Sequence, residues 1–118
     1  MSRREKHTTV REGKRLLWYT KRLWELSKDF EPFYIPLGEI VELDRDCWFG
    51  STEPTLREVA RHADRIAKAD LDYPIILNDD GSLMDGGHRV CKALINGQTS
   101  ILAVKFAEMP EPDEVLDE

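Results

Sequence analysis

The chain has 118 residues, of which 41% are hydrophobic and 34% are charged, and its formal net charge is −6. This length suits one domain built around a single core, and no apolar run approaches the roughly 20 residues that a membrane span needs. Basic residues near the start are not followed by an apolar segment, so we expect no secretory signal and a cytoplasmic protein.

The charge is unevenly distributed along the chain. Residues 1–28 hold nine Lys/Arg and three Glu, a local net charge of +6, whereas the rest of the chain sums to −12. An acidic body argues against non-specific DNA binding, which accumulates affinity from many phosphate contacts. The basic segment is expected to be a solvated helix face packed on its own domain, with an acidic partner as the alternative.

The N-terminal third is predicted to contain a helix. The first eight residues look disordered, and residues 9–28 carry apolar side chains at near-helical spacing. Pro32 ends that pattern, because the residue before a proline avoids the α region. Residues 33–37 and 39–43 are then expected to be extended.

A loop over residues 44–50 carries Cys47, Trp48 and Phe49. The two aromatic side chains could stack on a nucleotide base, but packing in the core is the favoured interpretation. The two cysteines, Cys47 and Cys91, are too few and too far apart for a disulfide framework or a zinc site. Both are expected to be buried thiols.

The second predicted helix has a clear start signal. Thr55 and Glu58 form a capping box, and apolar side chains at helical spacing continue to about Ala69. Residues 74–77 then read as a short buried strand, residues 78–81 as a turn, and residues 82–85 as the second arm of a hairpin.

A third helix is predicted from Gly87 to Asn96, with Gly97 as its stop. Residues 100–106 give the strongest strand, and the last residues read as an exposed acidic tail. The expected architecture is an α+β domain around a small mixed sheet flanked by helices. Its organisation is a basic N-terminal arm and helix (1–32), a main domain (33–107) and a tail (108–118).

The junction between the hairpin and the third helix is the best candidate site. Gly86 and Gly87 allow a tight turn and close approach of a ligand to the backbone. The first amides of the helix lack intrahelical acceptors and lie at the positive end of its dipole. His88 and Arg89 would add donors, so we expect an anion, most naturally a phosphate, to bind here.

The order of motifs over residues 34–106 resembles the ParB/sulfiredoxin-like superfamily. The resemblance rests on Pro74-Ile-Ile-Leu77, Met84-Asp-Gly-Gly-His-Arg89, Lys92-Ala93, Gly97 and the following strand. It implies a small mixed sheet flanked by helices, here with an additional N-terminal helix. Members bind nucleotides, ATP or CTP with Mg²⁺, so the resemblance implies a phosphate loop at Gly86, Gly87, His88 and Arg89.

Two departures narrow what the resemblance implies. Sulfiredoxin has a catalytic cysteine immediately before its His-Arg pair, where this chain has Gly87, so reduction of sulfinic acids is not expected. ParB proteins carry a DNA-binding domain after this region, whereas an acidic stretch follows Phe106 here. DNA partitioning is therefore not expected.

Further residues are candidates for the same site. Asp85 could hold Mg²⁺ through water or cap the helix, and His88 could contact phosphate or act as an acid or base. Lys92 lies one turn after Arg89. The helix over residues 55–69 flanks the nucleotide in this superfamily, which adds Thr55, Arg57 and His62.

The leading hypothesis is a nucleotide- or phosphate-binding domain, with NTP hydrolysis or phosphotransfer as an open possibility and no protein-bound metal cluster. The alternative is a non-catalytic protein-interaction module, or a homodimer, that uses Trp18, Tyr19 and Trp24 on the basic N-terminal helix. A nuclease ranks lower, because no carboxylate cluster with metal-ligand spacing is visible.

Overall fold

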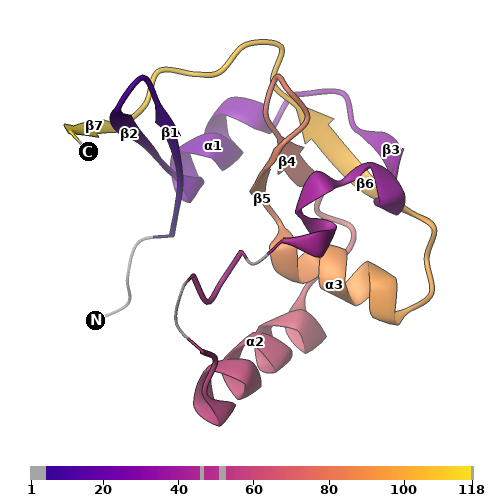
Figure 1. Cartoon of the computed structure of the whole chain (residues 1–118). Helices are drawn as coiled ribbons and strands as arrows, with labels where there is room; N and C mark the ends of the chain where they lie inside the picture. Colours follow the sequence, from indigo (N-terminus) through magenta and orange to yellow (C-terminus); the bar gives the residue numbers. More distant parts are fainter. Residues whose placement is uncertain (1–4, 46, 51–52, 118) are drawn as a thin grey trace.

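A computed structural model describes residues 5–45, 47–50 and 53–117. These residues form two sheets and three α-helices, which confirms the α+β class (Figure 1). The strands are β1 (Lys6–Arg11), β2 (Lys14–Tyr19), β3 (Phe33–Pro36), β4 (Ile75–Leu77), β5 (Leu83–Asp85), β6 (Ser100–Lys105) and β7 (Glu114–Asp117). The helices are α1 (Thr20–Ser27), α2 (Leu56–Lys68) and α3 (Gly87–Ile95), with 3₁₀ turns η1 (Leu37–Glu39) and η2 (Val41–Asp44).

The larger sheet has the order β3-β6-β4-β5, with β4 parallel to β6 and the other neighbours antiparallel. Its central strand β4 is apolar throughout because both faces of the sheet are covered. Ile75 and Leu77 point into one hydrophobic cluster and Ile76 into the other. The prediction of a buried strand at residues 74–77 is therefore confirmed.

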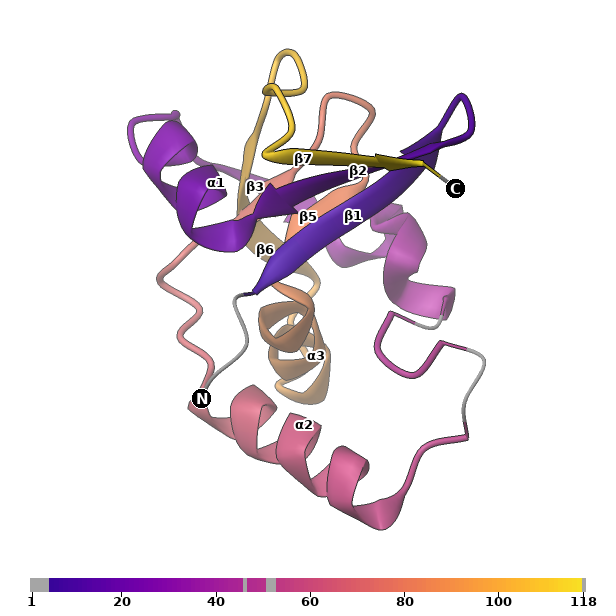
Figure 2. The same ribbon diagram turned by 90° about the vertical axis from the view of Figure 1, so that its left-hand side faces the viewer.

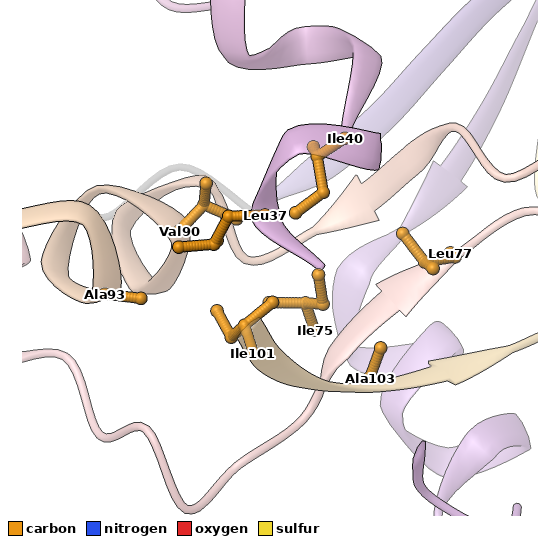
Figure 3. Packing of buried hydrophobic residues seen from close by; sticks show 8 residues of the cluster. All are labelled: Leu37, Ile40, Ile75, Leu77, Val90, Ala93, Ile101 and Ala103. Atoms are coloured by element: carbon orange, nitrogen blue, oxygen red, sulfur yellow. The ribbon is translucent and has the colours of Figure 1, made fainter. Parts of the chain in front are cut away.

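The first cluster lies between this sheet, α3 and η1 (Figure 3). Val90 and Ala93 project from α3 toward Ile75 and Ile101 of the sheet (Figure 3). The full cluster is Leu37, Ile40, Ile75, Leu77, Val90, Ala93, Ile101 and Ala103. This packing fixes where the N-terminal end of α3 lies relative to β4 and β5.

The second cluster covers the opposite face of the sheet with the N-terminal segment. Trp18 of β2 and Leu23 of α1 are fully buried there. They pack with Ile76, Met84, Val104 and Phe106. Figure 2 shows the smaller sheet, in the order β1-β2-β7, on this side of the molecule.

The predicted helix over residues 9–28 is wrong for its first half, which forms the hairpin of β1 and β2. Glu12 and Gly13 both have positive φ, 53° and 75°, as the tight turn of a two-residue hairpin requires. Only α1 is helical. The expected disorder of the first residues is contradicted for Lys6–Thr8, which lie in β1, while residues 1–4 lie outside the described part.

The predicted acidic tail also takes part in a sheet. β7 pairs antiparallel with β2, and Trp18 donates its indole N–H to the Pro110 carbonyl at 2.8 Å. The backbone carbonyls and amides of this acidic segment are thus used for pairing although its side chains are exposed.

Two smaller predictions are wrong as well: residues 41–44 form η2 instead of a strand, and Cys47 is exposed.

The elements that carry the site agree with the sequence. Thr55 accepts a hydrogen bond from the Glu58 amide at 3.1 Å, which confirms the predicted start of α2. The hairpin of β4 and β5 and the helix α3 are also confirmed. Both views place α2 at the periphery, beside α3 (Figures 1 and 2). No helix of the described residues is both long and apolar enough to cross a membrane.

Candidate functional site

A cleft of about 1300 Å³ lies where the N-terminal segment faces the turn from β5 into α3. Its lining combines residues of β1 and α1 with Asp85, Gly86, Gly87 and residues of α2. All three histidines of the chain line it. The cleft therefore brings together the glycine turn and His62, as predicted from the sequence, and adds His7, which no motif of the sequence indicated.

The turn into α3 depends on Gly86. Its φ of 116° is disfavoured for other residues, and an added Cβ would lie 2.5 Å from Cγ2 of Ile75. Gly86 is the N-cap of α3 and offers no side chain, and no side-chain hydrogen bond caps this helix among the described residues. In the part of the chain that the structure describes, the amides of Gly87, His88 and Arg89 meet no protein acceptor.

His88 and His62 form a hydrogen-bonded pair beside this first turn. Nδ1 of His62 lies 2.8 Å from Nε2 of His88. The indole ring of Trp48 stacks on both imidazoles, with ring centroids 4.2 and 4.5 Å away and planes within 12° of parallel. Trp48 also packs against Gly87, where a Cβ would approach it to 3.4 Å. Trp48 is thus part of this site, and not of either hydrophobic cluster.

The environment favours neutral imidazoles. Burial and then the positive charge of Arg65 lower the pKa of His88 to about 4. The same two causes, in the same order, lower the pKa of His62. Burial also lowers the pKa of His7, against the opposing charges of Glu42, Asp80 and Asp85. At neutral pH these rings can act as hydrogen-bond donors, acceptors or proton acceptors without carrying charge.

Asp85 and Arg89 form a partly buried ion pair, with 2.6 Å between the Arg89 guanidinium and Oδ2 of Asp85. The same oxygen accepts the indole N–H of Trp24 at 2.7 Å. Arg89 also donates to the backbone carbonyls of Tyr73 and Pro74. Asp85 therefore does not cap α3, and most of the Arg89 donors are engaged within the chain.

Three other predicted ligand-binding residues lie away from the cleft lining. Lys92 donates to the carbonyls of Ala67 and Ala69 at 3.0 and 2.6 Å, where it satisfies the C-terminal end of α2. Thr55 caps the opposite end of α2. Lys92, Thr55 and Arg57 are all absent from the lining residues. In contrast, Arg65 lines the cleft and is paired with Glu5.

The aromatic side chains of the N-terminal segment have separate environments. Trp18 is 1% exposed and belongs to the core. Tyr19 donates its hydroxyl to Glu114. Trp24 is 51% exposed and lines the cleft. Together they do not form one continuous surface of the kind that the interaction-module hypothesis assumed.

Among the described residues, no three or more His, Cys, Asp or Glu side chains are arranged to hold a metal ion. Oδ2 of Asp85, the residue predicted to hold Mg²⁺ through water or to cap the helix, is occupied by the side chains of Trp24 and Arg89.

A scan against protein-family models found no match, and comparisons with curated proteins and with solved structures found none either.

Proposed function

We propose that the cleft binds the phosphate group of a nucleotide or of a phosphorylated small molecule at the first turn of α3. The observation that carries this proposal is the set of three amides, of Gly87, His88 and Arg89, that face no acceptor among the described residues beside a cleft of about 1300 Å³. Such amides donate strong hydrogen bonds to anions, and the helix dipole adds to their attraction for phosphate.

Two further features support a ligand larger than phosphate alone. The volume of the cleft exceeds the usual range for small-molecule sites, which is roughly 300 to 1,000 Å³. Trp24 and Tyr73, which are 51% and 67% exposed, line it and offer aromatic faces for a base. ATP and CTP, each with Mg²⁺, are the ligands that the resemblance to the ParB/sulfiredoxin-like superfamily suggests.

That resemblance is itself part of the proposal. The hairpin, the glycine turn, α3 and the strand β6 follow one another in the order that the superfamily motif implies. Hydrolysis or phosphotransfer at this turn would use His88 as the base, because it is a neutral imidazole within the site. A cytoplasmic location remains a prediction from the sequence.

The interaction-module alternative has less support. Its three aromatic residues are divided between the core, a hydrogen bond to Glu114 and the cleft. A contact surface needs its aromatic anchors grouped and accessible.

Titration with inorganic phosphate, ATP and CTP, followed by the backbone amide signals of the ¹⁵N-labelled chain, tests the proposal. We expect the signals of Gly87, His88 and Arg89 to move most. The start of α2 is a control within the same molecule, because Thr55 already satisfies the Glu58 amide. Equal movement at both helix starts, or none at α3, would show that α3 is not a phosphate site.

A further inference from the structure

The His62–His88 pair, which we call the imidazole dyad, has no assigned role in the fold. One imidazole comes from α2 and the other from the first turn of α3. Their ring nitrogens are 2.8 Å apart, and Trp48 lies against one face of both rings. The stacking fixes the orientation of the two rings with respect to each other.

A contact of this length requires one proton between the two nitrogens. In the neutral dyad one ring donates and the other accepts, so Nε2 of His62 and Nδ1 of His88 are the nitrogens left for a ligand. One added proton strengthens the contact, because the hydrogen bond becomes charge-assisted. A second added proton would place two cations side by side. The dyad therefore has capacity for one proton.

Burial and the charges around the dyad decide when that proton is bound. On α2 these are Glu58, Arg61 and Arg65, and on the side of β5 and α3 they are Asp85 and Arg89. Burial and Arg65 are the main causes that keep both pKa values low.

The arginines do not supply uncompensated positive charge to a ligand. Of the described residues, the two arginines that line the cleft are paired with carboxylates, Arg65 with Glu5 and Arg89 with Asp85. A dianion placed at the start of α3 would therefore attract a proton to the dyad, which is the adjacent group able to gain a positive charge.

We propose that the His62–His88 dyad is part of the anion site and takes up one proton when a dianion binds there. This inference rests on the proposed function. The inferred ligand class is a phosphate monoester or a terminal phosphate, which carries two charges. A phosphodiester, which carries one, is expected to bind more weakly because it attracts the proton less.

Sulfate is the appropriate probe, since it remains a dianion from pH 5.5 to 7.5 while phosphate itself titrates. Calorimetry in two buffers of different ionisation enthalpy measures the protons taken up. We expect the uptake to approach one proton per sulfate and the affinity to rise by up to about tenfold per unit fall in pH. Methyl sulfate, a monoanion of related shape, should bind with less uptake.

The variant His62→Gln removes the dyad and keeps His88. We expect sulfate to bind it more weakly, without proton uptake, while the Gly87 and His88 amide signals still move. His7→Gln is the control, because His7 lines the same cleft outside the dyad and its replacement should leave the uptake unchanged. In the absence of ligand, α3 amide signals at the same positions as in the native chain show that each variant is folded.

The outcomes separate this inference from the proposed function. Sulfate binding at α3 without proton uptake, or with the same uptake in His62→Gln, overturns the role of the dyad and leaves the phosphate site standing. Absence of any response at α3 to sulfate, phosphate and nucleotides overturns both.

Discussion

Gly86 shows how strongly one position constrains the candidate site. Its backbone has a φ of 116°, and Ile75 occupies the space of a side chain. We predict that Gly86→Ala lowers the free energy of unfolding by roughly 2 to 5 kcal/mol, because the strain of a positive φ adds to overpacking. Urea denaturation measures the change.

Gly38→Ala is the matched control for that substitution. Gly38 has no positive φ, and nothing lies within 4 Å of the position of its Cβ. Its replacement should change the free energy of unfolding by less than about 0.5 kcal/mol. Equal effects at both glycines would argue against the close approach of Gly86 to Ile75.

Arg89 can be tested against a second pair of the same spacing. The side chains of Arg89 and Asp85 are each 15% exposed, whereas those of Lys68 and Asp64 are 75% and 59% exposed. We predict that Arg89→Met lowers the free energy of unfolding by about 3 kcal/mol, because it leaves a partly buried carboxylate without its cation. Lys68→Met should cost less than about 0.5 kcal/mol. Similar urea midpoints for the two variants would contradict this difference.

The sequence could identify several residues that line one cleft but not the partners of their side chains. It singled out Gly86, Gly87, His88 and His62, which do line one cleft. The hydrogen bond between His62 and His88 joins residues 26 positions apart, and no local pattern encodes such a contact. The sequence predicts that Arg89 and Lys92 bind a ligand. In the structure both side chains donate to backbone carbonyls of distant segments, which the sequence does not reveal.

At the level of elements, α2 differs from the other helices in having no buried residue among those described. Its stability should therefore depend on local interactions such as the Thr55 cap. We predict that Thr55→Ala speeds hydrogen exchange of the α2 amides about fivefold, corresponding to about 1 kcal/mol, with the urea midpoint of the whole protein little changed.

Thr55→Ser keeps a hydroxyl at the cap and should leave the exchange rates of α2 close to those of the native chain. Exchange that is unchanged in Thr55→Ala would mean that α2 opens only with the whole domain.

The N-terminal hairpin shows why the sequence misled about one element. Apolar residues over 9–28 fit a helical period, but Thr8, Thr9 and Val10 are β-branched, and Glu12-Gly13 is suited to a tight turn. The decisive contribution is tertiary, because β2 lies between β1 and β7 and buries Trp18. In contrast, α2 and α3 carried local start or stop signals, Thr55 and Gly97, and were predicted correctly.

For the molecule as a whole, the histidines predict a dependence of stability on pH. Burial lowers the pKa values of His7, His62 and His88 below 6.5, the value in the unfolded chain. The unfolded chain therefore binds more protons as the pH falls through this range, so stability is full above about pH 6.5 and declines toward pH 4. Urea midpoints from pH 7.5 to 4.5 should fall, and His88→Asn should flatten the decline. A level profile in the native chain would contradict the neutral state of these rings.

The pairing of β2 with β7 has a consequence for how the chain reaches its native state. Tyr19 and Asp113 are 94 positions apart, yet they are joined by a hydrogen bond at 2.8 Å. Contacts of such high sequence separation slow folding, because a large loop must close before they form. During translation, the N-terminal hairpin of β1 and β2 therefore has one edge of β2 unpaired until residue 117 has been synthesised. Until then, the unpaired edge of β2 is a site at which another chain could pair and cause aggregation.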